Sequence, residues 1–302
     1  MSLSLLIHLA VLVLAPPLLP GVINRVKAFF AGRSGPSVFQ LYFDLAKLMR
    51  KEAVISPTTT WIFRLGPGLG VVTALAAGLL LPFGPQAAPF GFTGDFILFA
   101  YLLAVGRFLT TLAALDTGSS FEGMGVAREL TFASLAEPAL FLVFLVLARV
   151  SGSLRLGAML QGPQGMQDFW PVALALAAAG LFVVLLAENC RVPVDDPNTH
   201  LELTMIHEVM VLDHSGPLLG LALYASSLKL FLFSVLLLHV LDPGGLDAGP
   251  MAWLVFAGGC LTVAAGVGLV ESVLARLRMR HVSRLLVTAC LLCGFAFLLV
   301  LR

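Results

Sequence analysis

The chain has 302 residues and a formal net charge of +1, and 59% of its residues are hydrophobic while only 12% are charged. Soluble globular domains contain roughly half apolar and roughly a quarter charged residues, so this composition excludes that class and indicates an integral membrane protein. The charge balance gives no indication of a nucleic-acid partner, and four scattered cysteines are too few for a disulfide framework.

The hydrophobic pattern predicts an all-α integral membrane protein with about eight transmembrane helices in a single membrane domain, residues 1–302. Each predicted span is a run of about 17 to 25 mainly apolar residues. The first contains three prolines and the second is short, so both are expected to be kinked, tilted or partly buried by their neighbours. The predicted spans are residues 3–23, 67–84, 94–115, 130–149, 170–187, 217–241, 251–274 and 284–301.

The distribution of Lys and Arg predicts the orientation in the membrane. The connections after the first, third, fifth and seventh spans carry thirteen of these residues, whereas the opposite side carries three. The positive-inside rule therefore predicts that these four connections are cytoplasmic and that both termini lie outside. The first apolar stretch has no basic n-region or clear cleavage site, so a retained helix is expected rather than a signal peptide.

The first cytoplasmic connection contains an expected amphipathic helix over residues 37–52. Its apolar residues recur at helical spacing, and Asp44, Lys47 and Lys51 share the opposite face with Gln40. Such a helix is expected to lie along the inner membrane surface. The alternative is that its polar face docks a soluble partner. The apolar positions are Val38, Leu41, Tyr42, Leu45, Leu48 and Met49.

Four ionisable residues fall within the predicted spans: Arg107, Glu137, Lys229 and Glu271. An ionisable group at membrane depth is costly and normally faces the interior of the bundle, where it is paired or hydrated. These four residues are therefore predicted to line a lateral path for protons or other ions. Two alternatives stay open, because Arg107 and Glu137 could form a static pair and Glu271 could simply be solvated.

Most of the remaining polar chemistry lies in residues 188–216, which contain six carboxylates, three histidines and Arg191. His200, His207 and His214 are seven residues apart, whereas helical metal ligands usually lie three or four apart. The CxxC formed by Cys290 and Cys293 sits in an apolar span, where packing is favoured over a redox or cluster site. No catalytic residue, metal site or cofactor is therefore expected in this chain.

Several motifs resemble one known family, in the right order along nearly the whole chain. Ala187-Glu188, Arg191, Pro193, Asp195, Pro197, Leu201-Glu202-Leu203 and Ser215-Gly216 resemble the signature loop of the superfamily of complex I membrane subunit 1. Arg33, Gly35-Pro36, Gln40, Asp44, Lys47 and Lys51-Glu52 resemble its first cytoplasmic loop. Arg128 and Glu137 resemble its second loop and the helix that follows.

The signature loop favours the hydrogenase branch of that superfamily. Quinone-reducing members usually carry a loop close to RxPFDLPEAE, whereas this chain reads RVPVDDPNTHLELTMIHEVMVLDHSG. The latter is similar to formate hydrogenlyase subunit 4 and to the membrane anchors of energy-converting nickel–iron hydrogenases, as is the segment from Gly123 to Glu129.

The resemblance implies a membrane anchor and coupling subunit in a bacterial or archaeal inner (cytoplasmic) membrane. Its expected partners are hydrogenase large and small subunits, iron–sulfur subunits and antiporter-like membrane subunits, and the nickel–iron centre and iron–sulfur clusters would belong to these partners. The cytoplasmic loops 24–66, 116–129 and 188–216 would seat the peripheral arm. The residues expected at this junction are Asp44, Glu52, Arg128, Glu188, Arg191, Asp195 and Glu202.

Three alternatives stay open at this point. The chain could be the quinone-site subunit of a complex I-like NADH/quinone oxidoreductase, or a stand-alone ion transporter with a substrate site between broken helices. A structural anchor without an ion path would leave the charged residues in the spans unexplained.

Overall fold

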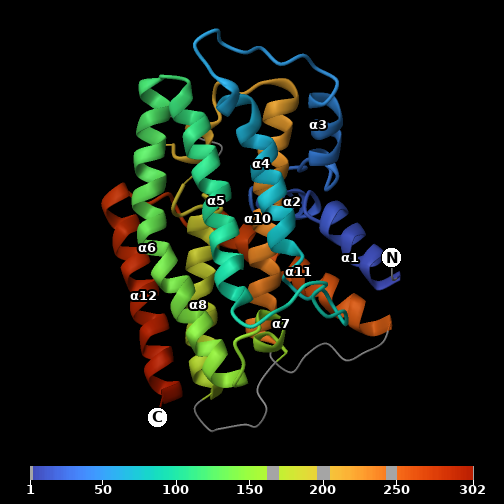
Figure 1. Cartoon of the computed structure of the whole chain (residues 1–302), viewed down its shortest axis with the longest axis vertical. Coiled ribbons are helices and arrows are strands. Elements are labelled where there is room, and N and C mark those ends of the chain that lie inside the picture. Colours follow the sequence, from blue (N-terminus) through green and yellow to red (C-terminus); the bar gives the residue numbers. More distant parts are fainter. Residues whose placement is uncertain (1–2, 162–169, 196–204, 243–249, 302) are drawn as a thin grey trace.

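The computed structural model describes residues 3–161, 170–195, 205–242 and 250–301, and these residues form helices with no sheet. The helices are α1 (Leu3–Leu14), α2 (Leu18–Phe30), α3 (Gln40–Leu48), α4 (Trp61–Gly78), α5 (Asp95–Asp116), α6 (Ser120–Ser151), α7 (Leu156–Met159), α8 (Trp170–Glu188), α9 (His207–Met210), α10 (Gly216–Leu241), α11 (Pro250–Val273) and α12 (Met279–Leu301). The α5–α6 connection and the loop after α3 lie at one end of the bundle, whereas α7 and the C-terminus lie at the other (Figure 1).

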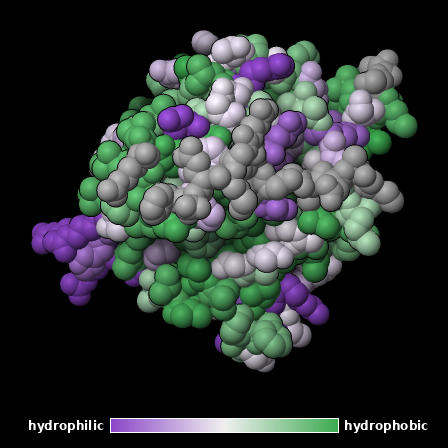
Figure 2. Space-filling model, turned by 90° about the horizontal axis from the view of Figure 1, so that it is seen from below, coloured by the Kyte–Doolittle hydropathy of each residue, from purple (hydrophilic) through white to green (hydrophobic). Residues whose placement is uncertain are grey.

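Within the described residues, seven helices are long and apolar enough to cross a membrane: α4, α5, α6, α8, α10, α11 and α12. The bent pair α1–α2 passes the same test when it is taken as one span, which makes up to eight. The eight predicted spans correspond to these elements, with shifted ends. The second was expected at 67–84, but α4 starts at Trp61, because the Thr60 side chain caps it by accepting a hydrogen bond from the Ile62 N–H. Seen from below, hydrophobic side chains lie along the outer edge of the molecule (Figure 2).

The fourth predicted span is the one whose extent differs most from the expectation. Residues 130–149 were expected to span the membrane, whereas α6 runs from Ser120 to Ser151. Its first turns are amphipathic rather than apolar, so a search for apolar runs misses them. Glu122, Gly125 and Glu129 are buried within these turns, which extend the helix into the predicted cytoplasmic junction.

The first span is broken by the prolines at 16–17 and bends by 43° between α1 and α2. Pro17 has no N–H to donate to the Val13 carbonyl. The Leu18 N–H donates to the Ala15 carbonyl, which leaves the Leu14 carbonyl without its helical donor. Both carbonyls therefore need other partners. The Tyr224 hydroxyl on α10 donates to Val13 at 2.9 Å, and the Tyr42 hydroxyl on α3 donates to Leu14. Two tyrosines therefore satisfy the backbone of the break, as membrane depth requires.

The short helix α3 packs against the protein with its apolar side. Leu48 and Met49 approach Gly220 so closely that a Cβ at Gly220 would lie 3.1 Å from the Met49 Cε atom. Phe39 and Phe43 are exposed on another flank. The apolar stripe seen in the sequence thus attaches α3 to α10.

The interior of the bundle around α6, α8 and α12 is apolar and tightly packed. Cys293 is fully buried, and a Cβ at Gly180 would lie 2.2 Å from its Sγ atom. The Cys290 thiol donates to the Leu135 carbonyl at 3.2 Å. The two cysteines of the CxxC are free thiols at helix contacts.

Candidate functional site

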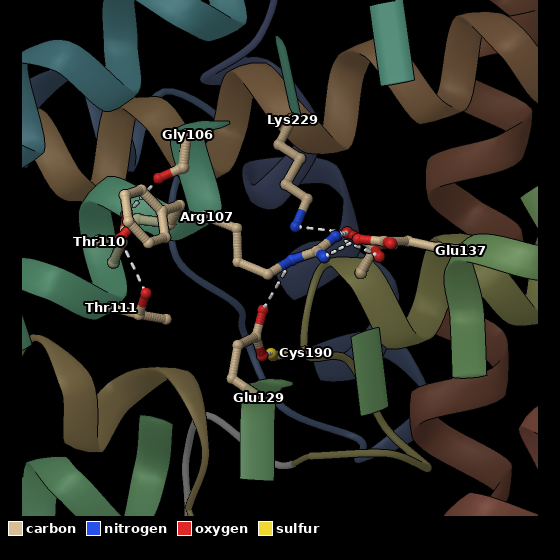
Figure 3. Close-up of polar contacts among 10 residues, drawn as sticks. Gly106, Arg107, Thr110, Thr111, Glu129, Glu137, Cys190 and Lys229 are labelled. Atoms are coloured by element: carbon tan, nitrogen blue, oxygen red, sulfur yellow. Dashed lines mark hydrogen bonds and ion pairs between the residues drawn. The ribbon is translucent and has the colours of Figure 1, made fainter. Parts of the chain in front are cut away.

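The polar interior of the bundle is centred on Arg107 of α5 (Figure 3). Its Nη1 atom lies 2.6 Å from Oε1 of Glu137 on α6, and its Nη2 atom lies 2.6 and 2.7 Å from the two carboxylate oxygens of Glu188 at the end of α8. Its Nε atom lies 3.7 Å from Oε1 of Glu129, also on α6. One guanidinium thus joins three carboxylates from two helices.

Lys229 of α10 and Cys190 complete the group. The Nζ atom of Lys229 lies 2.7 Å from Oε2 of Glu188. The Cys190 thiol donates to Oε2 of Glu129 at 3.5 Å. The group is called the Arg107 cluster below and comprises Arg107, Glu129, Glu137, Glu188, Cys190 and Lys229.

The Arg107 cluster carries two cations against three carboxylates, which leaves one negative charge when all of these groups are ionised. The side chains of Arg107, Glu129 and Glu188 are at most 9% exposed. Charges interact strongly in such an environment because little solvent screens them. The uptake of one proton would neutralise the cluster, so this arrangement is chemically suited to hold and pass a proton.

Glu137 is the member of the cluster that reaches the outside of the bundle. Its side chain is 43% exposed near the middle of α6, although Oε1 is paired with Arg107. A small cavity between α5 and α6 is lined by Arg107, Glu137, Tyr101 and Phe141. The cluster therefore extends from the interior to the outer surface of the bundle.

A larger cavity, called the chamber below, lies beside the Arg107 cluster between α4, α5 and α10. Its volume is about 80 Å³. Arg107, Glu129, Glu188 and Lys229 line it together with apolar residues of the three helices, and His214 also lines it. His214 is 4% exposed and stacks on Phe63, with ring centroids 4.0 Å apart.

A second group of charges lies outside the Arg107 cluster and is centred on Glu271 of α11. Its side chain is fully buried, with Oε2 2.8 Å from Nζ of Lys27 and Oε1 3.5 Å from Nη1 of Arg191. Next to it, Asp195 lies 3.3 Å from Arg276. These pairs join the loop after α8 to α2 and to the α11–α12 connection.

The structure thus brings together three of the four residues predicted for the ion path, Arg107, Glu137 and Lys229. The fourth, Glu271, pairs with Lys27 and Arg191 instead. Glu188 was expected at the junction and lies in the Arg107 cluster. Glu188 is the last residue of α8. Its side chain therefore reaches the Arg107 cluster, while the rest of the signature loop follows it directly in the chain.

The other junction residues lie at the end of the bundle expected to be cytoplasmic. Arg128 donates to the Met205 carbonyl at 3.0 Å, and Asp195 accepts from the Ile206 N–H at 2.8 Å. Asp44 accepts from Gln40 at 2.9 Å, and Glu52 is exposed. Glu202 lies outside the described residues.

Sequence reasoning missed Glu129 and Cys190. Glu129 falls one residue before the predicted fourth span, so it was taken as part of a loop, and α6 in fact continues through it. Its position eight residues before Glu137, which is close to two helical turns, is the signal that places both carboxylates on one side of a longer helix. Nothing in the sequence distinguishes Cys190 from a packing cysteine.

No group of three or more potential metal ligands occurs among residues 3–161, 170–195, 205–242 and 250–301. Burial raises the pKa of Cys190 well above its ordinary value, which keeps the thiol protonated. Burial also lowers the pKa of His207 and of His214 below 6.5. Both imidazoles are therefore neutral at pH 7, as uncharged hydrogen-bonding groups.

Comparisons with known proteins agree with this architecture. Residues 3–302 match the family described as NADH dehydrogenase. Formate hydrogenlyase subunit 4 of Escherichia coli is 31% identical over 299 residues, which cover 97% of this chain and 95% of that protein. Hydrogenase-4 component C of the same organism is 33% identical over 78% of this chain and 73% of its own length. An NADH-quinone oxidoreductase subunit of Anaplasma phagocytophilum is 28% identical over 71% of this chain and 68% of its own length.

A solved structure shares the fold. A chain of the membrane-bound sulfane sulfur reductase, an archaeal respiratory membrane complex, superposes with a TM-score of 0.84 at 20% identity, and the match covers 98% of both chains. The match to the family over residues 3–302 and the relatives above 30% identity establish the assignment. The chain belongs to the NADH dehydrogenase family of multi-pass membrane proteins, which includes formate hydrogenlyase subunit 4 and hydrogenase-4 component C.

Proposed function

We propose that this protein is the membrane anchor and coupling subunit of a multisubunit membrane-bound nickel–iron hydrogenase, of the formate hydrogenlyase group or a related one. It docks the peripheral redox arm and links electron transfer to the translocation of protons or sodium ions. The two relatives above 30% identity support the hydrogenase branch by their names. The nickel–iron centre and iron–sulfur clusters belong to the partner subunits in this proposal.

The Arg107 cluster is the observation that carries the coupling role. It begins at Glu188, directly before the loop proposed to meet the arm, and ends at Glu137, whose carboxylate faces outward at membrane depth. A charged group exposed to lipid is unfavourable. In the assembled complex this surface is therefore covered by an antiporter-like membrane subunit, to which the cluster passes its charge.

The ion pairs of the signature loop support the docking role. Glu271 joins Arg191 to Lys27, and Asp195 contacts both Arg276 and the Ile206 N–H. Several chain segments thereby hold Arg191, Asp195 and Ile206, on the two described sides of the loop, in position. Backbone that is already held loses little conformational freedom when a partner binds, which favours the use of these residues at a docking surface.

The coupling role is tested by Glu137→Gln in the intact complex reconstituted in vesicles. This variant keeps the shape of the side chain and removes its charge. We expect hydrogen evolution to continue while ion translocation per hydrogen falls severalfold. Asp242→Asn, at the outer end of α10, is the matched control and should leave both unchanged. Full translocation in Glu137→Gln would contradict the coupling role.

The hydrogenase assignment is tested by metal analysis of the complex purified through this chain. Nickel and iron–sulfur clusters should copurify in fixed ratio with it. The second candidate is a quinone-site subunit, which the chamber and the resemblance to an NADH-quinone oxidoreductase subunit favour. Copurified quinone without nickel would support that candidate and contradict the hydrogenase.

A further inference from the structure

Four arginines gather where α11 ends and α12 begins. The first of them, Arg276, is held by an ion pair of the signature loop. Within the described part of the chain, the other three make no ion pair and no side-chain hydrogen bond, and all are exposed: Arg278, Arg280 and Arg284. Residues 272–302 contain no Asp or Glu, so this segment does not neutralise the three charges itself.

Two of these arginines begin a stripe of exposed side chains along the outside of α12. One face of this helix is buried in the bundle, and the opposite face is exposed along its length. The exposed face starts with Arg280 and Arg284 and continues, at helical spacing, with apolar side chains that are 46–69% exposed. This apolar part is called the α12 stripe below and comprises Val287, Leu291, Phe295 and Leu298.

The length of α12 places the arginines at the level of the lipid headgroups. From Arg280 to Leu301 the helix rises roughly 30 Å, which is about the thickness of the hydrocarbon core of a bilayer. Arg280 and Arg284 therefore lie near one boundary of that core. The first turn of α12 is at the side of the bundle, below the end of α6 that extends into the predicted cytoplasmic junction (Figure 1).

The chemistry of the arginines selects an anionic headgroup. A guanidinium presents parallel N–H donors that match two oxygens of a phosphate, and it stays charged at any physiological pH. A zwitterionic headgroup also brings an ammonium group, which three neighbouring cations repel. Basic clusters directly beside the cytoplasmic end of a membrane-spanning helix attract anionic lipids for this reason.

We propose that Arg278, Arg280 and Arg284 form a binding site for an anionic phospholipid of the cytoplasmic leaflet. The phosphate lies at the arginines, and the acyl chains lie along the α12 stripe. One molecule thereby supplies both the negative charge and the apolar cover that this face of α12 lacks. The site is separate from the Arg107 cluster and does not rest on the function proposed above.

Photoactivatable phospholipids test the occupant at this place. The intact complex is reconstituted in phosphatidylcholine vesicles that contain a trace of phosphatidylglycerol or phosphatidylcholine with a diazirine in one acyl chain, and labelled peptides are mapped by mass spectrometry. We expect phosphatidylglycerol to label Val287 and Leu291 at least severalfold more than phosphatidylcholine does. Leu254, which is 67% exposed near the other end of α11, should be labelled equally by both.

Three variants test the part played by the arginines. Arg284→Gln removes one charge and should lower the ratio of phosphatidylglycerol to phosphatidylcholine labelling at Val287 and Leu291 severalfold. Arg284→Lys keeps the charge but loses the paired donors, so it should give an intermediate ratio. Arg149→Gln is the matched control, because Arg149 is exposed at the opposite end of the bundle, in the last turn of α6. It should leave the ratio unchanged.

The comparison of the two lipids in the unmodified complex decides the proposal even if a variant fails to assemble. Equal labelling of the α12 stripe by both lipids would overturn it. Protection of the stripe from both lipids would mean that a neighbouring subunit covers it, which would also overturn the proposal in favour of an acidic protein partner. Neither hydrogen evolution nor ion translocation is measured, so failure here leaves the coupling role untouched.

Discussion

The Nη2 atom of Arg107 lies 2.6 and 2.7 Å from the two carboxylate oxygens of Glu188, which joins the middle of α5 to the last residue of α8. Both side chains are less than a tenth exposed. Removing one partner of a buried pair leaves an uncompensated charge, whereas removing both is often tolerated.

Arg107→Met should therefore destabilise the protein by about 3–5 kcal/mol. The double variant Arg107→Met/Glu188→Gln should recover part of this loss, because it returns the net charge of the Arg107 cluster to −1, although Lys229 then loses its contact with the Glu188 carboxylate. The free energy of unfolding in mixed micelles measures both effects. A double variant less stable than Arg107→Met would contradict the buried pairing.

The tyrosines at the break between α1 and α2 give a second prediction. Tyr224→Phe removes the donor to the Val13 carbonyl at the outside of the bundle and should destabilise the first span by about 1–3 kcal/mol, because lipid offers the carbonyl no other donor. Faster hydrogen exchange in α1 and α2 would report this change. Tyr101→Phe is the control, since Tyr101 is 61% exposed. It should leave hydrogen exchange in α1 and α2 unchanged.

The helix contact between α8 and α12 gives a third prediction. Gly180→Ala places a Cβ 2.2 Å from the Cys293 Sγ atom and 3.3 Å from the Ala289 carbonyl oxygen. Overpacking of this kind typically costs about 1–3 kcal/mol. The second change Cys293→Ala should restore much of the loss, which a double-mutant cycle of thermal stability measures. Additive losses would mean that the two residues do not meet.

The two histidines of the loop, His207 and His214, give a prediction on pH. Burial holds the pKa of His207 and of His214 below 6.5 in the folded protein. The unfolded segment therefore binds more protons as the pH falls through about 6.5, and acidification destabilises the folded loop. The hydrogen-exchange protection of residues 205–215, corrected for the slower intrinsic exchange at lower pH, should fall between about pH 7 and pH 5.5. His214→Gln should weaken this dependence, and substitution of the exposed His281 should leave it intact.

The sequence predicted the helical class and the seven to eight candidate spans, because long apolar runs are dictated by the thickness of a bilayer. It also identified Arg107, Glu137 and Lys229, since charges at membrane depth are conspicuous and gather in the interior. Their role in translocation stays a prediction.

The limits of the apolar-run criterion explain why Glu129 was missed and why Glu271 was grouped with the ion path. Glu129 lies on turns of α6 that are too polar to be included in a predicted span. Glu271 was grouped with the ion path by its depth alone, but the bend at 16–17 carries Lys27 to within 2.8 Å of it. Such pairings depend on how helices that are distant in the sequence pack together. The spacing of apolar residues along the chain does not predict that packing.

The outward-facing carboxylate of Glu137 has a consequence for the life of the protein before assembly. A newly inserted copy without its neighbours presents a negative charge to the hydrocarbon core from the middle of α6. In the complex proposed above, where a neighbouring subunit covers this surface, that copy is less stable in the bilayer than the assembled one. Glu137, which is proposed to serve energy conversion, therefore also distinguishes an unassembled copy of the protein from an assembled complex.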